Sequence, residues 1–159
     1  MKLGLQVLVW VAVLFGAVAH AQSSLSFSAG QLGVTDDLRE PQWYGVELRF
    51  APVLRWAIVP GIGFHRAGCG ANYVYADFRK PIWLSDRWAL TPHFGPGLFT
   101  DSDQVNLGHD IQFRSGIELV YRTRKNLQVG VGITHLSNGS LSERNPGTET
   151  IGVSFSMPI

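Results

Sequence analysis

Apolar and polar residues alternate along most of the chain with a period of two. From Tyr44 to Phe50 every second residue is large and apolar, and Glu47 and Arg49 lie between them. This period is typical of β-strands, whose successive side chains point to opposite faces of a sheet. The pattern therefore predicts an all-β fold in which each strand has one apolar face and one small, polar or charged face.

Eight segments of about ten residues carry this alternation. They cover residues 24–35, 42–51, 54–65, 71–80, 87–98, 110–122, 126–136 and 149–159. Prolines in the fifth segment make its local register the hardest to predict, because proline cannot donate a hydrogen bond to a β-ladder. The connections alternate between short turns, as at 51–53 and 123–125, and longer polar loops, as at 99–109 and 137–148. This order is typical of an eight-stranded antiparallel barrel with both termini at one end.

Alternation alone does not say which face of the barrel points outward. A soluble, lipocalin-like barrel keeps its apolar face inside, whereas a membrane barrel turns it toward lipid and keeps a polar interior. The polar face here carries charges of both signs, which can pair in a narrow lumen. Five aromatic residues lie near segment ends, where membrane barrels have aromatic girdles: Trp43, Trp56, Trp83, Trp88 and Tyr121.

The start of the chain also favours the membrane. Met1-Lys2 is followed by an apolar run from Leu3 to Val18 and by Ala19-His20-Ala21. A basic start, a short apolar core and an A-x-A ending are the three parts of a secretory signal peptide. We therefore predict a signal peptide over residues 1–21, and over residues 22–159 an eight-stranded antiparallel transmembrane β-barrel of a bacterial outer membrane.

Composition excludes several other classes of function. The net charge of +1 implies no nucleic-acid partner, and the single cysteine, Cys69, cannot form an internal disulfide. His65, His93 and His109 lie on separate segments without ligand spacing, so we expect no metal site and no cofactor. His93 fits the polar network of the lumen. A solvated loop explains Asp101, Asp103 and Asp110 better than a cation site does.

Candidate chemistry gathers at the seventh and eighth segments. Leu127 to Ile133 form an odd-numbered apolar series, and His135 and Ser137 continue it. Glu149 begins the odd-numbered apolar series of the last segment. Three polar residues are therefore predicted on the lipid-facing wall of neighbouring strands, where polar groups carry an energetic cost.

The spacing predicts that these groups meet. Residues i and i+2 of a strand lie about 6.6 Å apart and point the same way, so His135 and Ser137 can approach each other. If Ile133 pairs with Ile151 and Val131 with Val153, His135 lies opposite Glu149, at about 4.5–5.5 Å.

A serine, a histidine and a carboxylate in this order can cleave an ester. The imidazole of His135 would remove the proton of Ser137, and Glu149 would orient that imidazole. The oxyanion needs hydrogen-bond donors, for which the candidates are the backbone N–H groups of Asn145 and Gly147 or the side-chain amide of Asn138. Each motif taken alone is also an ordinary turn sequence.

The stretch resembles the signature of the lipid A 3-O-deacylase (PagL-type) outer-membrane family. The resemblance consists of His-x-Ser-Asn-Gly at His135 to Gly139, followed by Asn-x-Gly-x-Glu at Asn145 to Glu149. The ending Met157-Pro158-Ile159 also resembles that of the family, although the final residue is not aromatic.

The resemblance implies a Ser-His-Glu hydrolase that removes the ester-linked acyl chain at position 3 of lipid A, with Asn145 contributing to the oxyanion site. Lipid A, or lipopolysaccharide, would be its partner in the outer membrane, and Arg144 is a candidate contact for a phosphate. The alternatives are a non-enzymatic barrel with a structural or adhesive role and a soluble ligand-binding barrel. The outer wall also permits a homodimer. The sequence does not indicate the acyl-chain preference or any regulation.

Overall fold

The computed structural model describes residues 22–34 and 38–159. The predicted signal peptide, residues 1–21, lies outside the described residues. Within the two described ranges, no helix is long and apolar enough to cross a membrane. The regular elements there are strands, which confirms the prediction of an all-β fold.

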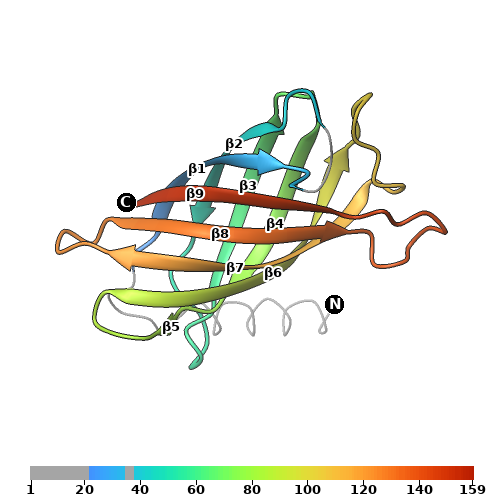
Figure 1. Cartoon of the computed structure of the whole chain (residues 1–159). Helices are drawn as coiled ribbons and strands as arrows, with labels where there is room; N and C mark the ends of the chain where they lie inside the picture. Colours follow the sequence, from blue (N-terminus) through green and yellow to red (C-terminus); the bar gives the residue numbers. More distant parts are fainter. Residues whose placement is uncertain (1–21, 35–37) are drawn as a thin grey trace, which may run out of the picture.

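Eight long strands form a closed antiparallel barrel, and a two-residue strand extends one of them (Figure 1). Each strand pairs with its neighbour in the chain, and the pairing of the first long strand with the last closes the barrel. The short strand, β5, pairs with the start of β6, while β4 also pairs with β6 directly. The strands are β1 (Ser24–Leu32), β2 (Gln42–Arg49), β3 (Val59–Ala67), β4 (Asn72–Arg79), β5 (Ile82–Trp83), β6 (Trp88–Thr100), β7 (Ile111–Arg122), β8 (Gln128–Ser137) and β9 (Thr148–Pro158).

The two ends of the barrel differ. One, which we call the termini end, carries the first described residues, the C-terminus and the connections 50–58, 80–87 and 123–127. The other, the loop end, carries the connections 33–41, 68–71, 101–110 and 138–147. The prediction that both termini lie at one end is therefore confirmed, and the predicted long loops lie at the other end. The alternation of short turns with longer loops is wrong in part, because the connections 50–58 and 80–87 at the termini end are longer than the connection 68–71 at the loop end.

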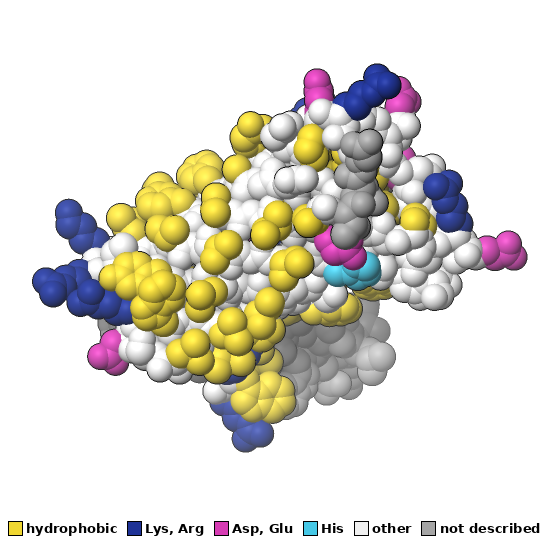
Figure 2. Space-filling view, viewed as in Figure 1, with side chains coloured by type: hydrophobic (Ala, Val, Ile, Leu, Met, Phe, Trp, Pro, Cys, Tyr) yellow, Lys and Arg dark blue, Asp and Glu magenta, His cyan; other side chains and the backbone are white. Residues whose placement is uncertain are grey.

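The apolar face of the strands forms the outer wall. Large apolar side chains such as Ile62, Val74 and Ile133 are exposed there. Figure 2 shows apolar side chains over the barrel wall, with charged side chains gathered toward its ends. An apolar outer wall of this kind is typical of a membrane barrel, because the acyl chains of the bilayer cover it.

The polar face lines the lumen and is held by charge pairing. Arg79 donates to both carboxylate oxygens of Glu47 at 2.8 Å each and to Glu118 at 3.0 Å. Arg49 reaches Glu47 at 3.2 Å, and Arg114 lies 3.5 Å from Asp77. Each guanidinium therefore has a carboxylate within reach, which offsets the cost of burying the charges.

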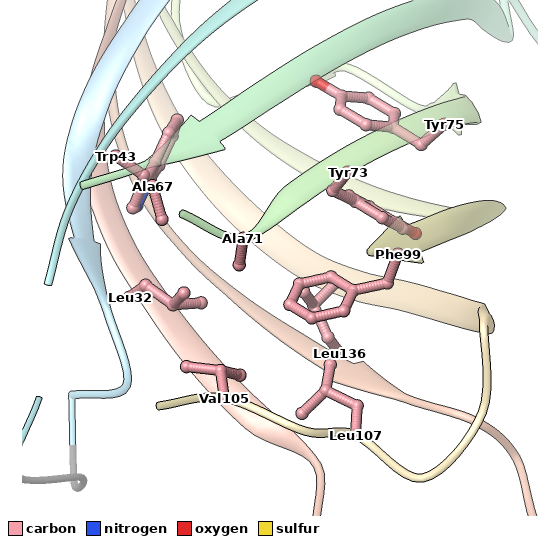
Figure 3. Close-up of a cluster of buried hydrophobic side chains, with 10 residues drawn as sticks. All are labelled: Leu32, Trp43, Ala67, Ala71, Tyr73, Tyr75, Phe99, Val105, Leu107 and Leu136. Atoms are coloured by element: carbon pink, nitrogen blue, oxygen red, sulfur yellow. The ribbon is translucent and has the colours of Figure 1, made fainter. Parts of the chain in front are cut away.

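Apolar side chains fill the lumen at the loop end. Ten buried residues pack together there (Figure 3), and two of them, Val105 and Leu107, come from the connection between β6 and β7. That connection therefore folds into the barrel mouth. Its packing closes the lumen at the end that carries His135 and Glu149.

The structure corrects two further sequence predictions. The third strand begins at Val59 and not at residue 54, because Leu54 and Ala57 adopt positive φ angles of 62° and 52°, which end an extended strand. Trp43 does not belong to the outer girdle: it is 8% exposed and stacks on His65 inside the barrel at 4.3 Å.

The prolines of the fifth segment leave its register intact. The pairs Tyr75–Gly97 and Phe78–Phe94 share one register between β4 and β6, and pairing is interrupted between them. Pro96, which has no N–H to donate, lies in that interruption. The ladder between β6 and β7 continues past it.

Candidate active site

The predicted register between the last two strands is confirmed. Ile133 pairs with Ile151 and Val131 with Val153, so His135 on β8 lies opposite Glu149 on β9. Their apolar partners below them are exposed on the outer wall. The two polar residues therefore continue the outward-facing rows toward the loop end.

His135 and Glu149 form a hydrogen-bonded pair on this wall. The Nδ1 atom of His135 lies 3.0 Å from Oε1 of Glu149, and the two side chains are 46% and 35% exposed. Because a carboxylate only accepts hydrogen bonds, Nδ1 is the donor in this pair. The second ring nitrogen, Nε2, is then the basic one. Figure 2 shows a histidine beside an acidic side chain on the outer surface, as this contact requires.

Ser137 is the last residue of β8 and lies on the same face of the strand as His135. It pairs across the ladder with Phe113 and is half-buried. Among the residues that the structure describes, no hydrogen bond involves its hydroxyl group. Contacts between a nucleophile and its base are often long in a free enzyme and shorten when substrate binds.

Gly147 lies directly beside the imidazole. Its φ angle of 66° belongs to the left-handed region, and a Cβ atom at this position would lie 2.9 Å from Cε1 and 3.4 Å from Nε2 of His135. Any larger residue would therefore strain the backbone and press on the edge of the ring that carries the basic nitrogen. The loop 138–147 thus ends against the imidazole of His135.

Inward-facing residues fix the strand that carries His135 and Ser137. The hydroxyl of Thr134 lies 3.0 Å from Nε2 of His93 in the lumen, which confirms the prediction that His93 belongs to the luminal network. Leu136 packs into the apolar cluster at the loop end. Each outward-facing candidate therefore lies between residues that are anchored inside the barrel.

The side-chain amide of Asn138, one of the predicted oxyanion donors, is buried between two loops. Its side chain is 0% exposed, and its Nδ2 donates to the carbonyls of Leu107 and Arg144 at 3.1 and 2.8 Å and to the Ser142 hydroxyl at 3.1 Å. With its amide buried among these acceptors, it joins the loop 138–147 to the loop 101–110. Gly108 allows the two loops to approach each other, because a Cβ atom at this position would lie 2.3 Å from the Arg144 carbonyl oxygen.

Asn145 is held by the same loop. Its Oδ1 accepts a hydrogen bond from the backbone N–H of Asn138 at 3.0 Å. Among the described residues, no hydrogen bond uses the backbone N–H of Asn145 or of Gly147. These two groups therefore remain candidates for an oxyanion site.

Other sequence candidates lie elsewhere. Arg144 is exposed on the loop end. The Asp101 carboxylate accepts the backbone N–H of Leu107 at 3.1 Å, so it stabilises the loop 101–110. His65 lies in the lumen, where its Nε2 is 3.1 Å from the Tyr75 hydroxyl.

Sequence reasoning missed Ser115. It pairs with His135 from β7, on the side opposite Glu149, and is exposed on the outer wall. It interrupts the odd-numbered apolar series of Phe113 and Ile117, and that interruption was the available signal. Three polar side chains from three adjacent strands, Ser115, His135 and Glu149, therefore lie at one level of the wall.

Comparisons with known proteins agree with this geometry. The sequence matches the family described as Lipid A 3-O-deacylase (PagL) over residues 19–158. No protein with curated annotation gives a significant sequence match.

Solved structures resemble the barrel at low sequence identity. The crystal structure of the outer membrane enzyme PagL has a TM-score of 0.67 at 19% identity, covering 86% of this chain and 99% of that one. The N-terminal β-barrel domain of Pseudomonas aeruginosa OprF has a TM-score of 0.59 at 13% identity, covering 87% of this chain and 100% of that one. These likenesses concern the fold, whereas the family match covers most of the sequence. The chain belongs to the Lipid A 3-O-deacylase (PagL) family of outer-membrane β-barrels.

Proposed function

We propose that this protein is an outer-membrane esterase that removes the 3-O-linked acyl chain of lipid A, with Ser137 as nucleophile, His135 as base and Glu149 as the orienting acid. The observation that carries the proposal is the 3.0 Å contact between His135 and Glu149 on the outer wall. Ser137 follows His135 by two residues on the same face. Family membership supplies the substrate class.

In the first half of the reaction, Oγ of Ser137 attacks the carbonyl carbon of the ester while Nε2 of His135 takes its proton. Glu149 holds Nδ1–H and stabilises the imidazolium. The tetrahedral intermediate then collapses, the bond to the sugar oxygen breaks, and the imidazolium returns the proton to that oxygen. The products of this half are the deacylated lipid and an acyl group on Ser137.

In the second half, water repeats the sequence. His135 removes a proton from a water molecule, which attacks the acyl carbonyl. Ser137 leaves with the proton that the imidazolium returns, and a free fatty acid departs. No metal ion or organic cofactor is required by either half.

The oxyanion of each intermediate needs nearby donors. We assign this role to the backbone N–H groups of Asn145 and Gly147. Gly147 lies against His135, and Asn145 is fixed to the start of the same loop through Asn138. Pro146, between them, has no N–H and is excluded.

A site on the outer wall suits a lipid substrate. Acyl chains already contact the wall, and the candidate residues lie where the apolar band meets the polar loops. With the loop end outward, this level corresponds to the headgroup boundary of the outer leaflet, where lipid A resides. The substrate reaches the site by lateral diffusion in the membrane.

A homodimer that forms through the outer wall stays a prediction.

Mass spectrometry of lipid A tests the proposal. Cells that make the parent protein should lose one hydroxyacyl chain from lipid A, and cells that make Ser137→Ala should not. A matched control is Ser115→Ala, which removes a neighbouring outer-wall hydroxyl and leaves Ser137 intact. Unchanged lipid A in intact cells and in detergent extracts, with well-folded parent protein, would contradict the proposal and favour the non-enzymatic barrel.

A further inference from the structure

The connections at the termini end are rich in positive charge. The connections 50–58, 80–87 and 123–127, together with Arg122 at the end of β7, contain a single acid, Asp86. They contain six cations, which we call the basic rim: Arg55, Lys80, Arg87, Arg122, Arg124 and Lys125. Figure 2 shows Lys and Arg side chains beyond the apolar band, on the side where Figure 1 shows the β7–β8 turn. The basic rim therefore borders the apolar wall.

The loop end has the opposite balance. Its described connections and the end of β3 carry three cations, Arg39, Arg66 and Arg144, and five acids, Glu40, Asp101, Asp103, Asp110 and Glu143. The charges of the lumen pair with one another and do not account for this difference. The molecule is therefore electrostatically polar along its axis.

Aromatic side chains accompany the basic rim. The guanidinium of Arg122 lies 4.0 Å from the ring centroid of Trp83, and that of Arg55 lies 5.5 Å from Trp56. Trp88 packs on Tyr121 at 5.0 Å between ring centroids, and Arg87 donates to the Tyr121 hydroxyl at 3.3 Å. Indole and phenol rings prefer the headgroup level of a bilayer. The rings therefore set the basic rim at the depth of lipid headgroups.

Hydrogen bonds join the separate connections into one surface. Lys80 Nζ donates to the Trp56 carbonyl, which links the second turn to the first. Arg122 donates to the Asp86 carbonyl at 3.0 Å, which links β7 to the second turn. Four members of the rim remain exposed, namely Arg55, Arg87, Arg124 and Lys125.

We infer that the basic rim binds the phosphate groups of anionic phospholipids in the leaflet at the termini end. Lys and Arg side chains at this depth are attracted to anionic headgroups, and the rim is continuous with the wall that contacts acyl chains. One anionic phospholipid can contact the basic rim with its phosphate and the apolar wall with its acyl chains. This interaction is independent of the esterase proposed above.

The tryptophans provide the measurement. Trp56, Trp83 and Trp88 are 58%, 44% and 45% exposed at the termini end, whereas Trp43 is buried in the lumen. The protein is reconstituted in phosphatidylcholine vesicles that contain an equal fraction of brominated phosphatidylglycerol or brominated phosphatidylcholine, and quenching of tryptophan fluorescence is compared. A chain that retains residues 1–21 first receives Trp10→Phe.

Brominated phosphatidylglycerol should bind about two- to fivefold better than brominated phosphatidylcholine at low salt. The preference should disappear in the triple variant Arg55→Gln, Arg124→Gln, Lys125→Gln. It should persist in the matched triple variant Arg39→Gln, Arg66→Gln, Arg144→Gln.

Equal quenching by the two lipids in the parent protein would overturn the inference and favour a different partner, such as an acidic protein. Equal loss of the preference in both triple variants would overturn it as well. If the first variant does not fold, the parent protein decides the question alone. Its preference must fall toward unity at 0.5 M salt, because screening weakens exposed charge pairs, and a preference that withstands this salt contradicts the basic rim as its source.

Discussion

Polar side chains have different surroundings in the lumen and on the outer wall of the barrel. In the lumen, Arg79, Glu47 and Glu118 are buried together and satisfy one another. On the outer wall, His135 and Glu149 form a hydrogen-bonded pair on a surface made mostly of apolar side chains. The comparison teaches that polar residues inside the barrel hold the fold, whereas the polar pair on the wall is where we propose that catalysis takes place. Substitutions in the two regions should therefore change different quantities.

Ser137→Ala should have the largest effect and should act on activity alone. Loss of the nucleophile is expected to lower kcat by at least about 10⁴-fold, as in other serine hydrolases. The side chain makes no hydrogen bond with the described residues, so the urea midpoint of unfolding in detergent should stay unchanged. Ester release from purified lipid A measures the first quantity. A fall in stability without a fall in rate would reverse the proposed contrast between the wall and the lumen.

Glu149→Gln should lower kcat by about 10²- to 10⁴-fold, because an amide can donate to Nδ1 and impose the wrong tautomer on His135. The barrel should still show heat-modifiable mobility on a gel. Steady-state kinetics of lipid A deacylation check the expectation. Parent-like kcat in this variant would mean that the contact between Glu149 and His135 is structural.

Arg79→Leu should produce the reverse pattern. Removing Arg79 leaves Glu47 and Glu118 to share Arg49 as their remaining cation, so their buried charge is compensated only in part. The barrel is expected to lose about 3–5 kcal/mol of unfolding free energy. Molecules that remain folded should cleave lipid A at the parent rate. Equilibrium unfolding in urea, combined with activity per folded molecule, separates the two quantities. A selective loss of kcat with parent-like stability would show that the lumen takes part in the chemistry.

Gly147→Ala should have the smallest effect, about a tenfold loss of kcat. The added Cβ would lie 2.9 Å from Cε1 of His135, and alanine is strained at a φ of 66°. A matched control is Gly139→Ala, which also carries a positive φ, 62°, but faces Phe113 and not His135. Equal losses of kcat in both variants would show that loop strain, and not pressure on the base, causes the effect.

Much of the fold was predictable because its determinant is local. A period of two in successive segments predicts the strands of an eight-stranded barrel, and matching apolar positions across β8 and β9 gave the pairing of His135 with Glu149. Boundaries that depend on turn geometry were not predictable. The positive φ angles of Leu54 and Ala57, for example, have no signature in the residue types.

The site was predictable only in part, because some of its contacts join residues that are far apart in the chain. The outward direction of His135 and Ser137 follows from strand parity, but the role of Asn138 depends on a distant loop. Its amide bonds to the Leu107 carbonyl, 31 residues away in the chain, and no local pattern predicts that contact. Trp43 shows the same limit, because an aromatic residue at a strand end suits either a girdle or a lumen. Ser115 was detectable by parity, but its closeness to His135 depends on the register between β7 and β8.

The most direct test of the outer-wall site is a double-substitution cycle on the rate of lipid A deacylation, using Ser137→Ala, His135→Ala and the two together. Nucleophile and base act as one unit in the proposed mechanism, so the double variant should be no slower than the slower single variant. If instead the two losses multiply, Ser137 and His135 act independently, and the outer wall does not hold the proposed catalytic unit.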